Sequence, residues 1–492
     1  MEFGCFTHLN RNKTNIMNRK LLFAILPILG LVGFLTLSSF YNPTDIDRMD
    51  PNPEPAPEVK YHGQSKKTTK NGLIRMSTGF QNDYFTNQKN EGFYYVEIEA
   101  DRFRNTNYSR PSMNLSIVID RSGSMSGDKI RNAKIAAKHI VDNLNADDYL
   151  SIIIYDQTVT TLQHQSHVKN KTAIKQKIDG IRERGSTNLM GGAMRGYDEV
   201  NKYYRSGYIN RVLLLSDGLA NEGIKDPAQI KKIVQGKFRE DNIAISTFGI
   251  GNDYNEDLMT AMAENGSGNY YFIQKPTEIA GIFRKELNGL MEVIAQNTML
   301  TINVPNEVKV DKVYGYPHTQ RGNKVTIKLN DIFSRETKGI LVKYKINRGN
   351  MPNRLAFTSS LSYRLASTER NKTIALRNNQ SFTNSPTVYN ENFSEWVDAQ
   401  VVLNEANYKM EMAMQAIDRG EYTKGRAMVK ETKNYISSKS KLVETSQELQ
   451  KAQEANTSYD SEIRDIETRS VSDRKYIQKA NKSTNYKIRR KK

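Results

Sequence analysis

The chain has 492 residues, enough for about three domains, and its single cysteine, Cys5, excludes a disulfide framework and any cysteine-based zinc cluster. Hydrophobic residues make up only 37% of the sequence, which predicts extended or polar segments beside the folded ones. The formal net charge is +18, but nine basic and no acidic residues lie between Arg474 and Lys492. Half of the excess therefore falls in one terminal segment. We expect a basic, disordered tail over 453–492 and no nucleic-acid partner.

The first 42 residues read as an export segment. No charged residue occurs between Leu21 and Asn42, and Arg19 and Lys20 come directly before this apolar run. About 20 apolar residues also suffice to span a bilayer, so a cleaved signal peptide and an uncleaved signal anchor both remain open. Either one predicts export to the periplasm or the cell surface, with an N-terminal transmembrane helix if the segment is retained. Residues 43–90, rich in Pro, Asn, Lys and Thr, predict a linker.

The central part of the sequence alternates between strand and helix patterns. Buried strands are predicted at 115–119, 149–155, 211–216, 243–249 and 269–273. Helices are predicted at 128–144, 169–181, 189–204, 226–239, 255–264 and 276–294. This alternation predicts an α/β fold over 113–294, with a doubly wound, mostly parallel sheet of the Rossmann-like kind and helices on both faces. Ligands of such sheets bind beyond the carboxyl ends of the strands.

Oxygen-bearing side chains follow two of these strands. Asp120, Ser122 and Ser124 alternate where the first strand gives way to a helix, and Asp217 follows the strand at 211–216. Thr187 lies between them, just before a predicted helix. Asp and Ser before a helix also act as caps, so the triplet alone would not establish a site. Together the five residues supply the hard oxygen ligands that Mg²⁺ prefers.

The pattern Asp120-x-Ser122-x-Ser124, then Thr187, then Asp217, resembles the metal-ion-dependent adhesion site of von Willebrand factor type A domains, in the exported bacterial type. The resemblance implies a bound Mg²⁺, with Mn²⁺ or Ca²⁺ as alternatives. It implies Ser122 and Ser124 as direct ligands, the other three binding directly or through water, and a partner's acidic side chain completing the site. Asp128 and Asp156 match no position of the motif, and we interpret them as a helix-capping and a strand-end turn residue.

Two further regions flank the central domain. Alternating segments at 298–304, 308–313, 324–329 and 339–346 predict a small β-sandwich over 295–366. The strand pattern at 93–99, within 91–112, has no earlier partner, and we expect it to join this sandwich, so that the central domain is an insertion. From Trp396 onward, apolar residues at three- and four-residue steps predict a helical hairpin over 392–452.

These observations predict an exported, membrane-associated binding protein that is not an enzyme and that captures an acidic group of a protein partner through a divalent cation. The alternatives are a cell-envelope scaffold or assembly factor in which the metal is secondary, and a metal-dependent hydrolase, for which no general base is recognisable. The basic tail adds the hypothesis of binding to an anionic envelope polymer or lipid.

Overall fold

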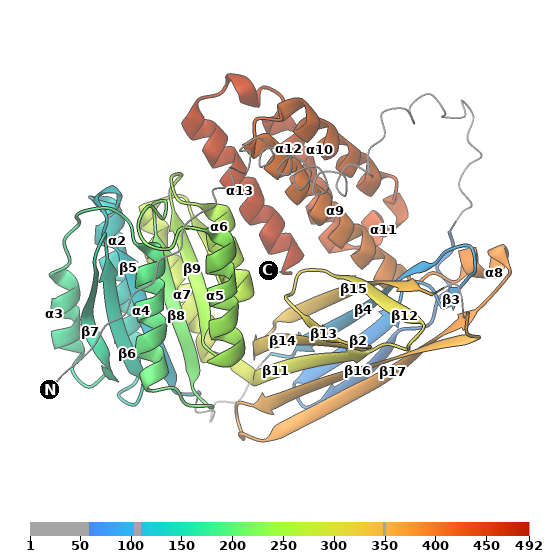
Figure 1. The fold of residues 1–492 in the computed structure, drawn as a ribbon, viewed down its shortest axis with the longest axis horizontal. Helices are drawn as coiled ribbons and strands as arrows, with labels where there is room; N and C mark the ends of the chain where they lie inside the picture. Colours follow the sequence, from blue (N-terminus) through green and yellow to red (C-terminus); the bar gives the residue numbers. More distant parts are fainter. Residues whose placement is uncertain (1–58, 103–109, 348–350, 492) are drawn as a thin grey trace, which may run out of the picture. The chain divides into compact units, whose positions relative to one another are not determined.

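The computed structural model of the chain describes residues 59–102, 110–347 and 351–491 (Figure 1). The predicted export segment and the first part of the predicted linker lie outside these residues. Within the described ranges, no helix has both the length and the apolar character that a membrane span requires.

A six-stranded sheet forms the centre of the middle domain, in the order β10-β9-β8-β5-β6-β7. All neighbours are parallel except β7, which pairs antiparallel with β6 at one edge. The strands are β5 (Met113–Asp120), β6 (Tyr149–Tyr155), β7 (Val159–His167), β8 (Ile209–Ser216), β9 (Ala244–Ile250) and β10 (Ser267–Ile273). The predicted fold class is confirmed. The edge strand β7 was not predicted, because its side chains are mostly half-buried and polar.

Helices cover both faces of this sheet because its strands are apolar on both sides. Leu115, Ile117 and Ile119 face one core, which α2 (Asp128–Asn143), α3 (Lys171–Asp179) and α7 (Ile279–Met291) complete. Val118 and Tyr155 face the other core. That core is closed by α4 (Leu189–Lys202), α5 (Pro227–Glu240) and α6 (Glu256–Asn265).

Two sheets, antiparallel except for the pairing of β17 with β3, form a sandwich around a single apolar core. One has the order β1-β2-β4-β15-β12, the other β13-β14-β11-β16-β17-β3. The first contains β1 (Lys67–Asn71), β2 (Ile74–Phe80), β4 (Glu91–Ala100), β15 (Thr337–Ile346) and β12 (Val308–Val313). The second contains β13 (Thr319–Arg321), β14 (Lys324–Phe333), β11 (Val293–Asn303), β16 (Arg354–Leu365), β17 (Asn371–Phe382) and β3 (Tyr84–Phe85).

The sandwich is larger than the sequence predicted. The prediction of a linker up to residue 90 is wrong for its described part, because β1, β2 and β3 lie there and bury Ile74, Met76 and Phe80 completely. Strand β1 is polar along its whole length and has no fully buried residue, which is why this part of the segment looked like a linker. The sandwich also continues past residue 366 through β17, which pairs with β16 along its whole length.

The central domain is inserted into this sandwich. Strand β4 pairs antiparallel with β15, with Val96 opposite Ile340. On leaving β4, Asp101 accepts a backbone hydrogen bond from Arg335, and on return Glu292 accepts one from Ser334. The entry and exit of the insertion therefore meet at one short turn of the sandwich.

The predicted helical hairpin is present, as two helices over Glu395–Asp418 and Tyr422–Ser437 that pack against each other, but further helices follow it, so the prediction of a disordered tail over 453–492 is wrong. The C-terminal region contains α9 (Glu395–Asp418), α10 (Tyr422–Ser437), α11 (Ser440–Thr445), α12 (Gln447–Glu462) and α13 (Val471–Arg489), after the short α8 (Pro386–Glu391) (Figure 1). Helix α13, predicted as disordered, buries Tyr486 in the same core as α4, α5 and α6.

Ion pairs explain why the basic segment is ordered. Lys482 contacts Glu256, Asp257 and Asp418 at 2.9, 2.9 and 2.5 Å, and Lys479 and Arg489 pair with Glu256 and Glu264. Although burial raises the pKa of Glu256, Lys482 and Lys479 hold it below its usual range. Glu256, Asp257, Glu264 and Asp418 lie more than 60 residues before the cations they contact, so local composition shows only the cations.

Candidate metal centre

The candidate site lies at the carboxyl ends of two adjacent parallel strands. Asp120 is the last residue of β5, and Asp217 follows the last residue of β8. The two strands pair in register, with Ile119 beside Leu215. Both carboxylates are therefore presented at the same edge of the sheet, and neither residue has any solvent exposure.

The loop after β5 folds back on its own aspartate. One oxygen of Asp120 accepts a hydrogen bond from the backbone N–H of Ser122 at 2.8 Å, and the other accepts from the Ser216 hydroxyl at 2.7 Å. The next residues form a single 3₁₀ turn, Gly123–Met125, in which Met125 is fully buried. This anchored turn fixes the direction of Ser122 and Ser124 before α2 begins.

The three hydroxyls and Asp217 converge on one point. The Oγ atoms of Ser122 and Ser124 lie 3.1 Å apart, and the Ser124 hydroxyl donates to Asp217 Oδ1 at 2.7 Å. A Cβ atom placed on Gly218 would lie 3.1 Å from Thr187 Oγ1 and 3.5 Å from Ser124 Oγ. The structure thus brings all five predicted residues together, and Gly218 leaves room for them.

Asp156 positions the loop that carries Thr187. Its carboxylate accepts hydrogen bonds from Thr158 at 2.7 Å, as a strand-end turn predicts, and also pairs with Arg121 and Arg184 at 2.8 and 2.9 Å. Its backbone oxygen accepts from the N–H of Asn188 at 2.9 Å. Asp156 is therefore a support of the site rather than a member of it.

The Thr187 loop is also tied to the loop after β8. The backbone N–H of Thr187 donates to Asn221 Oδ1 at 2.8 Å, and the Thr187 carbonyl accepts from the N–H of Asn221 at 3.2 Å. Gly185 turns this loop at a φ of 75°, where an added Cβ would overlap the Gln157 side chain. Sequence reasoning missed Asn221, whose role depends on contact between two loops.

Lys129 is the second contributor that the sequence did not single out. Its ammonium lies 2.5 Å from Asp217 Oδ2 and donates to the Ser124 carbonyl at 3.1 Å. It follows the first residue of α2, so the helix start directs it back over the site. By contrast, Asp128 is exposed and pairs with Arg131. It is the first residue of α2, whose N-cap is Gly127 without a side-chain capping bond, so the helix-capping interpretation is wrong.

The carboxylates need a positive partner. Burial raises the pKa of Asp120 to about 6, against the opposing effect of hydrogen bonds from Ser122 and Ser216, and the nearby Asp217 charge raises it further. Two carboxylates held this close and away from water are costly unless a cation neutralises them. Lys129 supplies one positive charge, which leaves the pair with one negative charge in excess.

A second group of acids does not offer a comparable site. Carboxylate oxygens of Glu256, Asp257 and Asp418 lie within 4.8 Å of one another. However, the Lys482 ammonium contacts all three. This group is a structural ion-pair network between α6, α9 and α13.

Residues 114–285 match the family model described as the von Willebrand factor type A domain. The middle domain is a von Willebrand factor type A domain.

Two solved structures share more of the architecture than this domain alone. A von Willebrand factor type A protein from Catenulispora acidiphila superposes with a TM-score of 0.67 at 13% identity, covering 85% of this chain and 98% of its own. The ArnB paralogue VWA2 from Sulfolobus acidocaldarius gives 0.59 at 18% identity, covering 84% and 98%. At these identities the similarity concerns the fold.

Sequence relatives match less than half of this chain. The uncharacterized protein YfbK of Escherichia coli is 33% identical over 213 residues, which are 43% of this chain and 37% of that protein. Inter-alpha-trypsin inhibitor heavy chain H3 of Rattus norvegicus is 28% identical over 226 residues, which are 44% of this chain and 25% of that protein. The chain thus matches well under half the length of these relatives.

Proposed function

We propose that Asp120, Ser122, Ser124, Thr187 and Asp217 bind a divalent cation, and that an acidic side chain of a protein partner completes its coordination. Mg²⁺ is the first candidate, with Mn²⁺ and Ca²⁺ as alternatives, because all three accept oxygen ligands. When bound, the cation would supply a positive centre that recognises a carboxylate. The general role of vWA domains in protein–protein interaction supports this proposal.

One observation carries the proposal. Five oxygen-bearing side chains from three separate loops converge at the carboxyl ends of β5 and β8, with both carboxylates fully buried. The donor set consists of oxygens alone, which suits a hard cation. The Lys129 ammonium already lies against Asp217, so a positive charge is favourable at this position. The residues present therefore fit the proposed group.

Export of the chain is part of the proposal and rests on the sequence. The uncharged run from Leu21 to Asn42 follows Arg19 and Lys20, the arrangement of a signal peptide or a signal anchor. We propose that the vWA domain acts in the periplasm or at the cell surface. Binding to an anionic polymer or lipid through residues 453–492 has little support, because Lys479, Lys482 and Arg489 are engaged in ion pairs with acids of the same chain.

A scaffold or assembly role is the second candidate. It is favoured by the contact of α13 with the vWA domain, where Tyr486 joins the domain core and its hydroxyl accepts from the N–H of Tyr270 at 3.2 Å. Affinity capture with wild type and Asp217→Ala separates the two candidates: partners that survive the substitution favour the scaffold. A hydrolase is not supported, because the groups that contact the five side chains in the described residues are hydroxyls, backbone amides and the Lys129 ammonium.

The test is thermal unfolding of the full chain with and without Mg²⁺, Mn²⁺ or Ca²⁺. A cation present at 100 times its dissociation constant should stabilise the folded state by about 2.7 kcal/mol. For a domain of this size that corresponds to a rise in the unfolding midpoint of roughly 5–11 °C. We expect this rise in wild type and its loss in Asp120→Ala.

Asp128→Ala is the matched control, because it removes an exposed carboxylate eight residues away that lies outside the site. It should keep the full rise. If both variants lost the rise equally, the stabilisation would come from the overall negative charge of the region and not from a specific cation site. No rise in wild type with any of the three cations would contradict cation binding and favour the scaffold.

A further inference from the structure

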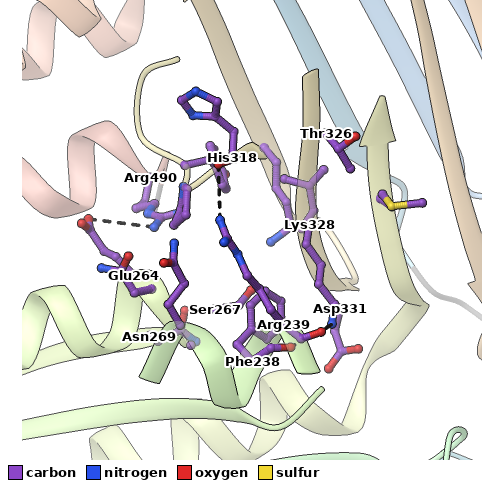
Figure 2. A pocket seen from close by; sticks show the side chains of 18 of the residues that line it. Phe238, Arg239, Glu264, Ser267, Asn269, His318, Thr326, Lys328, Asp331 and Arg490 are labelled. Carbon is purple, nitrogen blue, oxygen red and sulfur yellow. Dashed lines mark hydrogen bonds and ion pairs between the residues drawn. The ribbon is translucent and has the colours of Figure 1, made fainter. Parts of the chain in front are cut away.

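A cavity of about 210 Å³ lies away from the metal centre, where three parts of the chain meet (Figure 2). Its walls come from the vWA domain around the end of α5 and the start of β10, from the sandwich strands β13 and β14, and from Arg490 just after α13. Its volume well exceeds the roughly 30 Å³ that one water takes in the liquid. A small polyatomic ligand can therefore enter it together with water.

Positive side chains outnumber negative ones in the wall. Five basic residues face three carboxylates there, and they are Arg211, Arg239, Lys328, Lys338 and Arg490 against Glu264, Asp331 and Glu336. Some of these charges are matched: Lys338 pairs with Glu336 at 2.8 Å, and Arg211 pairs with Glu286, behind the wall, at 3.0 Å. Arg490 lies 3.9 Å from Glu264.

Two of the cations have no acid at ion-pair distance within the described residues. The Lys328 ammonium donates to the Phe238 carbonyl at 2.8 Å, and Arg239 donates to the His318 carbonyl at 3.3 Å. Figure 2 shows Arg239 and Lys328 lying side by side across the cavity from Arg490. Backbone carbonyls hold these groups in place but leave their charge without a counter-ion.

Two arginines of the wall are incompletely hydrogen-bonded. The Nε atoms of Arg211 and Arg490 are buried and have no hydrogen-bond partner among the described residues. Arg211 is only 1% exposed, so water cannot readily satisfy it from outside. A hollow lined by cations that have no acid at ion-pair distance has the character of an anion site.

We propose that this cavity binds a small free oxyanion of the phosphate or carboxylate class, held by Lys328, Arg239 and Arg490. Its oxygens would receive hydrogen bonds from the Lys328 ammonium and the Arg239 guanidinium, which now donate to backbone carbonyls, and from Arg490, which lies 3.9 Å from Glu264. The small volume favours a small free molecule. Because the walls belong to the vWA domain, the sandwich and the segment after α13, the anion would also hold these three parts together.

The electrostatic surroundings of Lys328 agree with this proposal. Burial lowers the pKa of Lys328 to about 8, which shows that its positive charge is poorly compensated, with Asp331 the one acid that favours it. An anion beside the ammonium would supply the missing compensation. The proposal does not depend on the metal centre, whose residues contribute nothing to this cavity.

The experiment is calorimetric titration of the full chain with inorganic phosphate and, separately, with acetate, at constant ionic strength set by NaCl. We expect one of the two anions to bind at concentrations up to about 10 mM. Lys328→Gln and Arg239→Gln should each lower its affinity about tenfold or more, the worth of a charge-assisted hydrogen bond. Phosphate binding alone would identify a tetrahedral oxyanion site, and acetate binding alone a carboxylate site.

Matched controls lie on the same elements. Lys324→Gln removes an exposed lysine of β14, and Lys232→Gln removes one from α5, and neither residue lines the cavity. Both controls should bind the anion as wild type does, and so should Asp217→Ala, which separates this site from the metal centre. Binding of neither anion, or equal losses in the controls, would overturn the proposal.

Discussion

The candidate metal centre and the proposed anion cavity have opposite charge balances, and each contains at least one group of the opposite charge. At the candidate metal centre two buried carboxylates dominate, and among the described residues Lys129 is the cation that pairs with one of them, Asp217. In the cavity basic groups dominate, and Asp331 lies among them, 3.8 Å from Arg211. In each case the opposite charge offsets part of the excess and leaves the remainder for a ligand.

The two sites differ in how their groups are held. Hydroxyls and backbone amides fix the carboxylates of the metal centre, so the oxygens that would bind a cation are already hydrogen-bonded to one another. The cations of the cavity are held by backbone carbonyls and, in the case of Arg211, by a buried ion pair. The comparison shows two ways of holding charged groups. The carboxylates of the candidate metal centre are held by short polar loops of one domain, whereas the long cationic side chains of the cavity are held by groups from several parts of the chain.

The largest effect is expected from breaking the ion pair that supports the cavity wall. Arg211→Met leaves Glu286 buried, with Ser246, Asn269 and Tyr271 as its remaining donors. An uncompensated buried charge costs about 3–5 kcal/mol, and we expect that loss in the free energy of unfolding measured with urea. The double variant Arg211→Met/Glu286→Gln should recover much of it. A single variant as stable as wild type would show that the pair contributes nothing.

A medium effect is expected from pH at the cavity. The probe is sulfate, whose charge does not change between pH 5 and 9. As pH rises through about 6, Asp331 loses its proton, because burial raises its pKa to that value against the nearby Arg211 charge. As pH rises through about 8, Lys328 loses its charge. Both changes disfavour an anion, so affinity should be greatest at low pH and fall about tenfold overall.

The other groups that face Lys328 must be considered in that measurement. They are Arg211, Arg239, Lys338 and Arg490, with Glu264, Glu336 and the imidazole of His318. The arginines stay charged throughout. A His318→Gln background removes the imidazole, and the decrease near pH 8 should persist there and vanish in Lys328→Gln. Affinity that rises with pH would contradict the assignment.

The smallest effect is expected from the cation at the metal centre. Lys129→Met removes an ammonium that a bound metal ion must compete with for Asp217. We expect the dissociation constant for Mg²⁺ to fall about fivefold, since a partly exposed ion pair is worth up to about 1 kcal/mol. Calorimetric titration measures it, with Lys138→Met, on the same helix and paired with Asp179, as the control. Weaker binding would mean that Lys129 supports the site.

The grouping of the five residues of the candidate metal centre could be predicted from the sequence, because they follow strands or precede helices. Asp120, Ser122 and Ser124 lie within five consecutive residues. Parallel pairing of the two predicted strands places Asp217 beside them. Lys129 and Asn221 were not predicted. The role of Lys129 depends on the direction in which a helix begins, and that of Asn221 on the contact between two loops.

By itself the sequence determined the alternation of apolar strands and helices, and with it the doubly wound sheet and the five residues at its edge, because these depend on local periodicity and on the ends of strands. Only the tertiary structure decided that the segment at 67–85 joins the sandwich and that the basic end of the chain is helical. Those outcomes depend on partners far away in the sequence: β4 and β17 for the early strands, and Glu256, Glu264 and Asp418 for α13. Charge compensation between residues far apart in the sequence leaves no local pattern. The cavity could not be predicted from the sequence for the same reason, because its lining residues come from distant segments.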